Sequence, residues 1–179
     1  MSALVVYESV YGNTRAIAEA IADGLGGADV TAVHEAPARP EGLDLLVIGG
    51  PTHMHGLATN RSRQMGADGV KEDGAGHVEP GATQEPGLRT WLAALPNGDG
   101  AKAATFDTRL DRSPWLTGVA SRGIAKRLRH RGCEVVDRES FLVEESEGPL
   151  APGELERARD WGRTLAGLVP QGVAAGGAS

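Results

Sequence analysis

Short, unbroken runs of hydrophobic residues alternate along this chain with stretches in which hydrophobic residues recur every three or four positions. The unbroken runs lie at 3–7 and 43–50, the segments 101–106 and 133–143 also have strand-like sequence, and a less certain strand lies at about 30–33. Runs of this length are typical of strands that are buried on both faces of a parallel sheet. The sequence therefore predicts five strands.

The stretches with helical spacing lie between these runs and after the last one. In the first stretch Ile17 and Ile21 recur on one face, and the glycine pair at 26–27 marks its end. The expected helices cover 13–25, 88–95, 119–131 and 153–168. Alternating strands and helices with short links predict an α/β fold, a doubly wound five-stranded parallel sheet with right-handed crossovers. Such sheets bind ligands beyond the carboxyl ends of their strands.

Two segments do not fit this alternation. Residues 64–84 are rich in glycine, alanine and charged residues with little hydrophobic periodicity, which predicts a mobile excursion after the 43–50 strand. Residues 170–179 have the composition of a disordered tail. We therefore expect one domain, over residues 1–169.

Composition narrows the class of protein. The 179 residues are 40% hydrophobic and carry a formal charge of -6, so one core is expected and nucleic acid is not expected as a partner. The single cysteine, Cys133, excludes an internal disulfide and fits a small core residue in a protein of the reducing cytoplasm. The first hydrophobic run has no basic leader and is too short to span a membrane, so we expect no membrane association. His34, His77 and His130 have no companions at catalytic spacing and are expected at the surface.

The junction between the first strand and the first helix has the features of a phosphate site. Ser9 and Thr14 offer hydroxyl groups, Gly12 lets the backbone approach a ligand closely, and Asn13 can cap the helix. Main-chain N–H groups at the start of a helix also attract anions. An ordinary capped turn is the alternative for this segment.

Three other strand-loop-helix sites are excluded by their missing residues. The junction has neither the GxxxxGK[ST] pattern of a P-loop nor the GxGxxG pattern of a dinucleotide site. A phosphoreceiver domain needs an acidic residue after the third strand, where this chain has Gly49 and Gly50.

Residues 5–14, followed by Ala18 and Ile21, resemble the FMN signature of flavodoxins. The resemblance covers about residues 3–168 apart from the 64–84 segment, and it implies a sheet of order 2-1-3-4-5 in a short-chain arrangement. It also implies one FMN bound without a covalent link. Two residues depart from the family pattern: Tyr11 stands where a threonine is common, and Arg15 adds a charge after the loop.

The resemblance implies that two further loops hold the flavin ring. In the loop after the third strand, Thr52 can donate to the cofactor and Met54 can pack on the ring. The His55-Gly56 peptide is the candidate for the peptide whose carbonyl turns toward flavin N5 when the flavin is reduced. The histidines there lack the carboxylate or cysteine companions of a metal site, and an incidental surface loop is the alternative. In the loop after the fourth strand, Thr108 and main-chain groups near Asp107 can meet the ring edge, while Trp115 either stacks on the ring or anchors the loop. The candidate cofactor residues are Ser9, Val10, Tyr11, Gly12, Asn13, Thr14, Pro51, Thr52, His53, Met54, His55, Gly56, Asp107, Thr108, Arg109, Trp115 and Gly118.

Two functions follow from the resemblance. The first is an FMN-binding electron carrier, and the alternative is an FMN-dependent NAD(P)H:quinone oxidoreductase of the same fold. A module without flavin fits the intact phosphate motif less well. The helix at 119–131 carries a basic face at which an acidic redox partner protein can dock, although a solvated helix face has the same composition. The oligomeric state stays open.

Overall fold

The computed structural model describes residues 1–53, 56–73, 77–112 and 118–169. Its sheet has the order β2-β1-β3-β5-β6, in which all neighbours are parallel, and β4 adds an antiparallel pair to β3. The strands are β1 (Ala3–Tyr7), β2 (Asp29–Ala32), β3 (Leu45–His53), β4 (Gly56–Leu57), β5 (Lys102–Leu110) and β6 (Glu134–Val143). The predicted doubly wound sheet and the order of its five parallel strands are confirmed.

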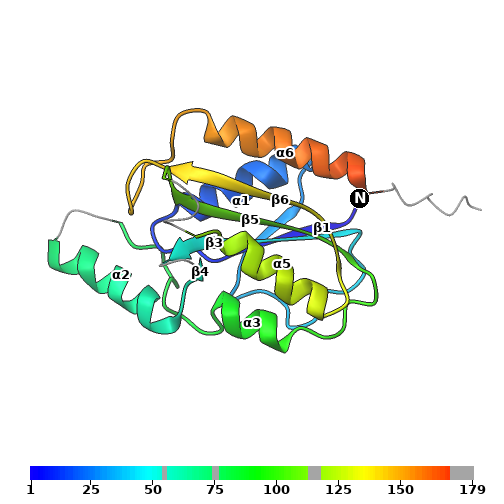
Figure 1. Cartoon of the computed structure of the whole chain (residues 1–179), viewed down its shortest axis with the longest axis horizontal. Helices are drawn as coiled ribbons and strands as arrows, with labels where there is room; N and C mark the ends of the chain where they lie inside the picture. Colours follow the sequence, from blue (N-terminus) through cyan, green and yellow to red (C-terminus); the bar gives the residue numbers. More distant parts are fainter. Residues whose placement is uncertain (54–55, 74–76, 113–117, 170–179) are drawn as a thin grey trace, which may run out of the picture.

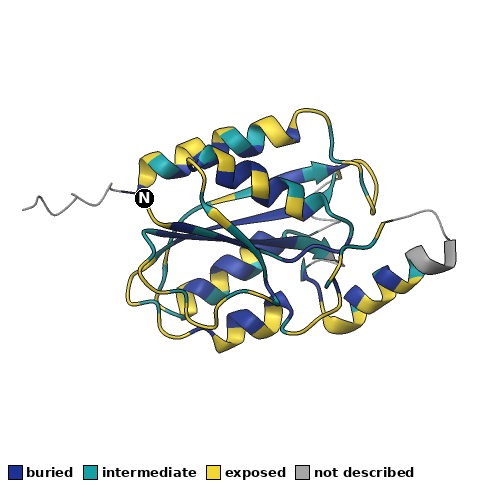
Figure 2. Ribbon diagram, turned by 180° about the vertical axis from the view of Figure 1, so that it is seen from behind, coloured by how far each residue is buried: buried dark blue, intermediate teal, exposed yellow. Residues whose placement is uncertain are grey.

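Helices cover both faces of this sheet, as Figure 1 shows. The pair α1 and α6 lies on one face, and α3 and α5 lie on the other. Their bounds are α1 (Asn13–Gly24), α2 (Asn60–Asp73), α3 (Leu88–Ala94), α5 (Ala120–His130) and α6 (Glu154–Leu168). Buried residues, dark blue in Figure 2, lie along the sheet and on the helix faces that touch it. Within the described ranges, no helix is long and apolar enough to cross a membrane.

The two faces of the sheet bury separate hydrophobic clusters. Under α1 and α6, the rings of Phe106, Phe141 and Trp161 meet edge to face with centroids 6.1–6.5 Å apart. Under α3 and α5 the cluster centres on Leu88 and Ile124, and the half-buried Cys133 packs against it. Together these clusters fix the carboxyl ends of the strands at one edge of the molecule.

Strands β3 and β5 continue beyond their predicted ends. The glycine pair Gly49-Gly50 was expected to close β3, yet the strand continues to His53. A Cβ atom on Gly49 would lie 2.2 Å from the Phe106 ring, so this glycine is needed for packing and does not end the strand. Strand β5 likewise extends to Leu110, which places Asp107, Thr108 and Arg109 on the strand and not in the expected loop.

The 64–84 segment differs most from its prediction. Helix α2 occupies its first half, where an irregular excursion was expected, although only two of its described side chains, those of Arg63 and Ala67, are buried. Its mean hydropathy is low because charged and small residues dominate, which is why hydrophobic periodicity did not reveal it. Whether the segment is mobile stays a prediction. His34 was expected at the surface, but its side chain is only 14% exposed.

Candidate functional site

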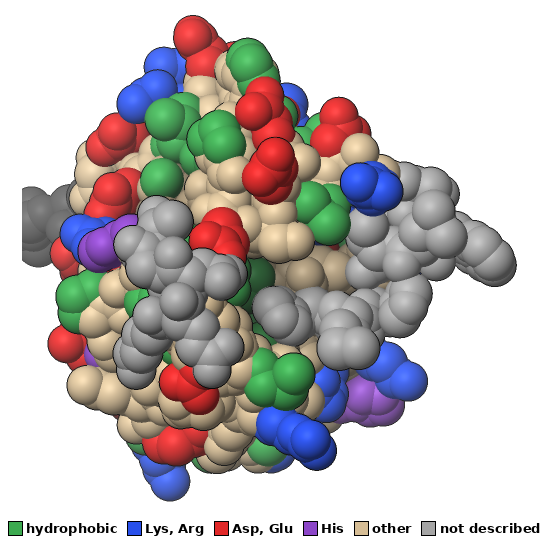
Figure 3. Space-filling view, turned by 90° about the vertical axis from the view of Figure 1, so that its left-hand side faces the viewer, with side chains coloured by type: hydrophobic (Ala, Val, Ile, Leu, Met, Phe, Trp, Pro, Cys, Tyr) green, Lys and Arg blue, Asp and Glu red, His purple; other side chains and the backbone are tan. Residues whose placement is uncertain are grey.

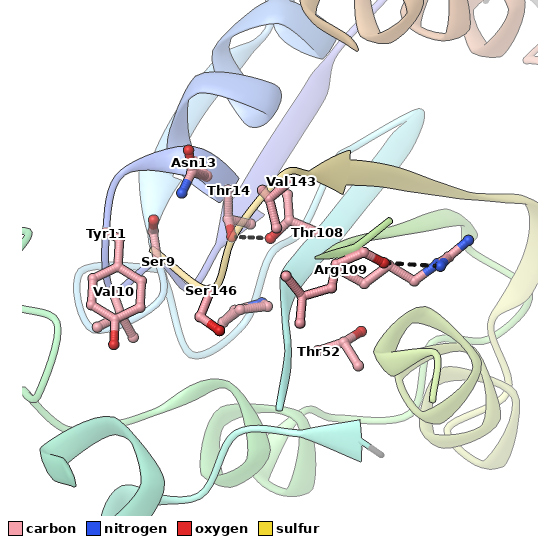
Figure 4. Close-up of a pocket in the computed structure, with 12 residues that line it drawn as sticks. Ser9, Val10, Tyr11, Asn13, Thr14, Thr52, Thr108, Arg109, Val143 and Ser146 are labelled. Atoms are coloured by element: carbon pink, nitrogen blue, oxygen red, sulfur yellow. Dashed lines mark hydrogen bonds between the residues drawn. The ribbon is translucent and has the colours of Figure 1, made fainter. Parts of the chain in front are cut away.

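A pocket of about 240 Å³ opens at the carboxyl edge of the sheet, the edge that faces the viewer in Figure 3. It lies among the loop after β1, the ends of β3 and β5, and the chain at and beyond the end of β6 (Figure 4). The residues that line it are Ser9, Val10, Tyr11, Asn13, Thr14, Pro51, Thr52, Thr108, Arg109, Leu110, Val143 and Ser146. The structure therefore brings residues from all three predicted loops to one pocket.

The loop after β1 forms a tight turn that leaves the start of α1 open. Gly12 has φ 89°, a left-handed conformation that favours glycine, and its N–H donates to Ser9 Oγ at 3.1 Å. Helix α1 has no side-chain cap at its first residue. Asn13 was expected to cap it, but its amide donates instead to the carbonyl of Glu147 at 2.9 Å. The first N–H groups of the helix are thus available to an anion.

Two threonines meet at the centre of the pocket. The hydroxyl oxygens of Thr14 and Thr108 lie 2.7 Å apart, and a dashed line marks this hydrogen bond in Figure 4. Both residues are buried. One hydroxyl donates to the other, so the accepting hydroxyl keeps its own proton for a ligand. This contact joins α1 to β5 and sets polar donors beside the open helix start.

Asp107 lies behind the pocket and does not line it. Its carboxylate accepts from Thr52 Oγ1 at 2.8 Å and from the N–H of Ser121 at 3.1 Å, while the N–H of Ala120 donates to Thr52 Oγ1 at 2.9 Å. Asp107 is fully buried, and its Oδ1 has no partner within the described ranges. These bonds satisfy the N-terminal N–H groups of α5 and fix Thr52 at the pocket wall.

The remaining predicted loop residues are placed as follows. His53 and Gly56 face each other as the closing pair of the hairpin between β3 and β4. Met54 and His55, and therefore the His55-Gly56 peptide, lie outside the described residues, as does Trp115. Gly118 has φ 77° and precedes α5. Arg109 lines the pocket and donates to the carbonyls of Leu110 at 3.2 Å and Arg112 at 2.7 Å.

A buried arginine attaches α2 to this edge of the sheet. The Arg63 side chain is 2% exposed and donates to the carbonyls of Ala82 at 3.3 Å and Gln84 at 2.9 Å. Its guanidinium also pairs with Glu85 at 2.6 Å and lies 3.6 Å from Glu8 at the end of β1. We call residues 60–73 and 77–87 the α2 segment, because Arg63 ties both parts together.

Glu8 is the acidic partner of Arg63 in the interior. Burial raises the pKa of the Glu8 carboxyl, and the N–H of Leu88, which donates to Glu8 Oε2 at 2.8 Å, opposes that rise together with Arg63. Its Oε1 has no partner in the described part of the chain. The first strand is thus joined to the α2 segment by buried charge.

The α2 segment also touches the loop after β1. A Cβ atom on Gly66 would lie 2.8 Å from the Tyr11 hydroxyl, so helix and ring are in close contact. The N–H of Glu79 donates to the carbonyl of Val10 at 2.8 Å, and Arg15 pairs with Glu79 at 3.3 Å. Both departures from the family pattern, Tyr11 and Arg15, therefore contact this segment.

Sequence reasoning missed three pocket residues. They are Leu110 at the end of β5, Val143 at the end of β6, and Ser146 just beyond it. The bond between Asn13 and Glu147 holds the chain beyond β6 over the first loop. No local pattern signals this contact, because the bonded residues are 134 positions apart.

The sheet and the helices define a doubly wound α/β protein with a pocket at the carboxyl edge of its sheet. A model of the family described as flavodoxin domain matches residues 4–62. Among solved structures, a flavodoxin from the domain Archaea is 20% identical, with a TM-score of 0.58, and the match covers 96% of this chain and 100% of that chain. A flavodoxin of Streptococcus pneumonia TIGR4 is 17% identical, with a TM-score of 0.63, over 94% of this chain and 100% of that chain.

A third similar structure is described as a flavodoxin, WrbA-like protein, from Agrobacterium tumefaciens. It is 20% identical, with a TM-score of 0.57, and the match covers 93% of this chain and 96% of that chain. A search among curated proteins gave no match. The chain therefore has a flavodoxin-like fold, and a flavodoxin-domain model matches its N-terminal third.

Proposed function

We propose that this protein binds one FMN without a covalent link in the carboxyl-edge pocket and acts as an electron carrier. The observation that carries the proposal is the meeting of Thr14 and Thr108 hydroxyls beside the uncapped start of α1. Main-chain N–H groups and hydroxyls at a helix start suit a terminal phosphate. The fold and the N-terminal family match support the same ligand.

The pocket residues fit the parts of FMN. Ser9 and Thr14 with the main chain of the first loop would hold the phosphate, and the strand ends at Pro51, Thr52 and Thr108 would border the ring. Bound FMN would supply reversible electron transfer. The Thr52 hydroxyl, which Asp107 and the N–H of Ala120 hold in place, and Arg109 make this wall of the pocket polar.

Substitution of Thr14 tests the phosphate assignment. Thr14→Val removes a hydroxyl at the helix start, so FMN affinity is expected to fall about tenfold, the effect of one hydrogen bond to a charged group, while riboflavin affinity stays unchanged. Affinity is measured by quenching of flavin fluorescence on titration with apoprotein. Thr164→Val, on the exposed face of α6, is the control and should change neither affinity.

Two results would contradict the proposal. A protein that quenches no flavin fluorescence does not bind FMN. Equal losses for FMN and riboflavin in Thr14→Val would place the phosphate elsewhere in the pocket.

The same holoprotein separates the carrier from the NAD(P)H:quinone oxidoreductase. Mixed with NADPH alone without oxygen, a carrier keeps its yellow flavin colour, and an oxidoreductase bleaches within the mixing time of the experiment. The chain has no GxGxxG nicotinamide fingerprint, which favours the carrier.

A further inference from the structure

A second hollow, of about 450 Å³, lies next to the candidate FMN pocket on the side of β6. Arg109 lines both the hollow and the pocket. The charged side chains around the hollow come from β5, α5, β6 and α6, and they are Arg109, Arg122, Arg138, Arg157, Glu139 and Glu154. We call it the arginine hollow.

The arginine hollow carries excess positive charge on an acidic protein. Its four arginines face two glutamates, and both glutamates are engaged by Arg157, at 2.6 Å from Glu154 and 3.2 Å from Glu139. Among the described residues, Arg109 donates only to carbonyl groups, and Arg122 and Arg138 make no ion pair. Three guanidinium charges thus have no acidic partner in the described part of a chain whose net charge is -6.

The main-chain donors around the hollow are already occupied. Strand β6 is an outer strand of the sheet, next to β5 alone. The N–H groups of its residues 138, 140 and 142 donate to the carboxylates of Asp137, Glu139 and Glu154. The first N–H groups of α5 donate to Thr52 and Asp107. An added strand cannot pair with this edge, and a free phosphate finds no nest of N–H groups.

The basic helix that the sequence singled out contributes only its first turn. Helix α5 starts at the flavin edge and runs back along the sheet, so Arg127, Arg129 and His130 lie in its last turn. Arg131 follows that turn and donates to the carbonyl of Ala93 at the end of α3. This bond lies near the amino ends of the strands, away from the candidate FMN pocket. Only Arg122 of this helix lines the hollow.

We propose that the arginine hollow, built around Arg109, Arg122 and Arg138, docks a carboxylate-rich surface of the redox partner protein. Long, unpaired guanidinium groups from several elements suit carboxylates on a protein surface, because they need no free main-chain donors. Arg109 sets this contact directly beside the flavin pocket, which is where electrons would leave. The proposal rests on the proposed carrier function.

Two small electron acceptors of opposite charge test the electrostatic potential around the arginine hollow. Holoprotein is reduced with dithionite, and each reduced FMN then gives two electrons to two ferricyanide anions while its protons pass to solvent. Ferricyanide is expected to react about tenfold more slowly at about 1 M than at about 0.01 M ionic strength, because salt screens the attraction. Hexaammineruthenium(III), a cation, should show the opposite trend.

Charge reversal locates the effect. At about 0.1 M ionic strength, where the Debye length is about 10 Å, Arg122→Glu and Arg138→Glu should each slow ferricyanide about threefold. Arg129→Glu makes the same change of charge roughly 10 Å farther along α5 and should alter the rate less than about twofold at this salt concentration. Equal effects of Arg122→Glu and Arg129→Glu, or a ferricyanide rate that rises with salt, would overturn the proposal.

A second measurement does not need the flavin and so separates the two proposals. Apoprotein is titrated into fluorescein-labelled hexaglutamate, and binding is followed by anisotropy. Loss of binding in Arg122→Glu and Arg138→Glu, but not in Arg129→Glu, supports the hollow even if FMN binding fails. Equal binding by all variants overturns it, and so does displacement of the peptide by adenosine 2′,5′-bisphosphate at equal concentration, which would indicate a small phosphate ligand.

Discussion

The loop after β1 and the α2 segment meet at the same edge of the sheet, but different forces hold them there. The loop is shaped by contacts within itself, the left-handed Gly12 and its bond to Ser9, and the uncharged hydroxyl pair of Thr14 and Thr108 attaches it to β5. The α2 segment buries few hydrophobic side chains and is attached through the charge cluster of Arg63. The shape of the loop therefore depends mainly on its own residues and on neutral hydrogen bonds, whereas the position of the α2 segment depends on buried charged residues.

This difference has an energetic consequence. A buried ion pair gains little net free energy, because desolvation of two charges offsets their attraction. Removal of one member is nevertheless costly, since the other charge stays buried without compensation. The α2 segment should therefore be more sensitive to a single substitution at its attachment than the loop is to loss of any one hydrogen bond.

The largest effect is expected from Arg63→Met. This change leaves Glu8 buried with only the N–H of Leu88 as a donor, and it frees two carbonyl groups of the α2 segment. The free energy of unfolding should fall by about 3–5 kcal/mol, as measured by urea denaturation. Arg61→Met, at an exposed position on the same helix, should change it by less than about 0.5 kcal/mol.

A double variant checks the cause of that loss. Glu8→Gln together with Arg63→Met removes both charges, so it should be more stable than Arg63→Met alone. If the double variant is less stable than either single one, the cluster acts by packing and the contrast between the two regions fails.

The contact between helix α2 and the loop is tested by two glycines of that helix. A Cβ atom on Gly66 would lie 2.8 Å from the Tyr11 hydroxyl, whereas one on Gly69 would meet nothing within 4 Å. Gly69→Ala should raise the free energy of unfolding by up to about 1 kcal/mol through helix propensity. The free energy of unfolding of Gly66→Ala should be about 1–3 kcal/mol lower than that of Gly69→Ala, because the Tyr11 side chain must move to make room for the added Cβ atom.

Flavin titration of the same two variants extends this test. Displacement of Tyr11 should weaken FMN in Gly66→Ala but not in Gly69→Ala, since Tyr11 lines the pocket. Identical stability and identical FMN affinity in the two variants would mean that the helix does not press on the loop.

The sequence predicted the loop and the parallel sheet because their signals are local. Residues 9–14 carry their hydroxyls and glycine within six positions, and the central strand segments 3–7 and 43–50 are continuous hydrophobic runs. The α2 attachment could not be predicted, because helix α1 and the strands β2, β3 and β4 lie between Glu8 and Arg63 along the chain. The place of Ser146 in the pocket could not be predicted for a similar reason, because the neighbouring Glu147 bonds to Asn13, 134 positions away.

Strand ends were misjudged for a related reason. Glycine is a usual terminator of strands, yet Gly49 is required by the Phe106 ring on the neighbouring strand, so its meaning depends on a partner more than 50 residues away. The prediction that Asp107 lies near the ring edge placed it in a loop, whereas its position on β5 turns the carboxylate toward α5.

The smallest effect is expected from substitution of Glu79, whose carboxylate lies in the α2 segment beside the loop that would hold the phosphate. Its Oε1 lies 3.0 Å from the position of a Cβ atom on Gly12, and its side chain is 12% exposed. A carboxylate there repels an anion bound at the loop, and Arg15, which is half exposed, offsets this only in part. Glu79→Gln should therefore tighten FMN about two- to fivefold in low salt and leave riboflavin unchanged.

A matched variant separates repulsion from release of Arg15. Glu19 pairs with Arg15 at 2.8 Å but lies on the exposed face of α1, away from the loop. If Glu19→Gln tightens FMN as much as Glu79→Gln does, the gain comes from freeing Arg15. If the gain occurs only in Glu79→Gln and disappears in high salt, the carboxylate itself acts on the phosphate site. Weaker FMN binding in Glu79→Gln would instead mean that this side chain supports the loop, because its main-chain bond to Val10 is unaffected by the change.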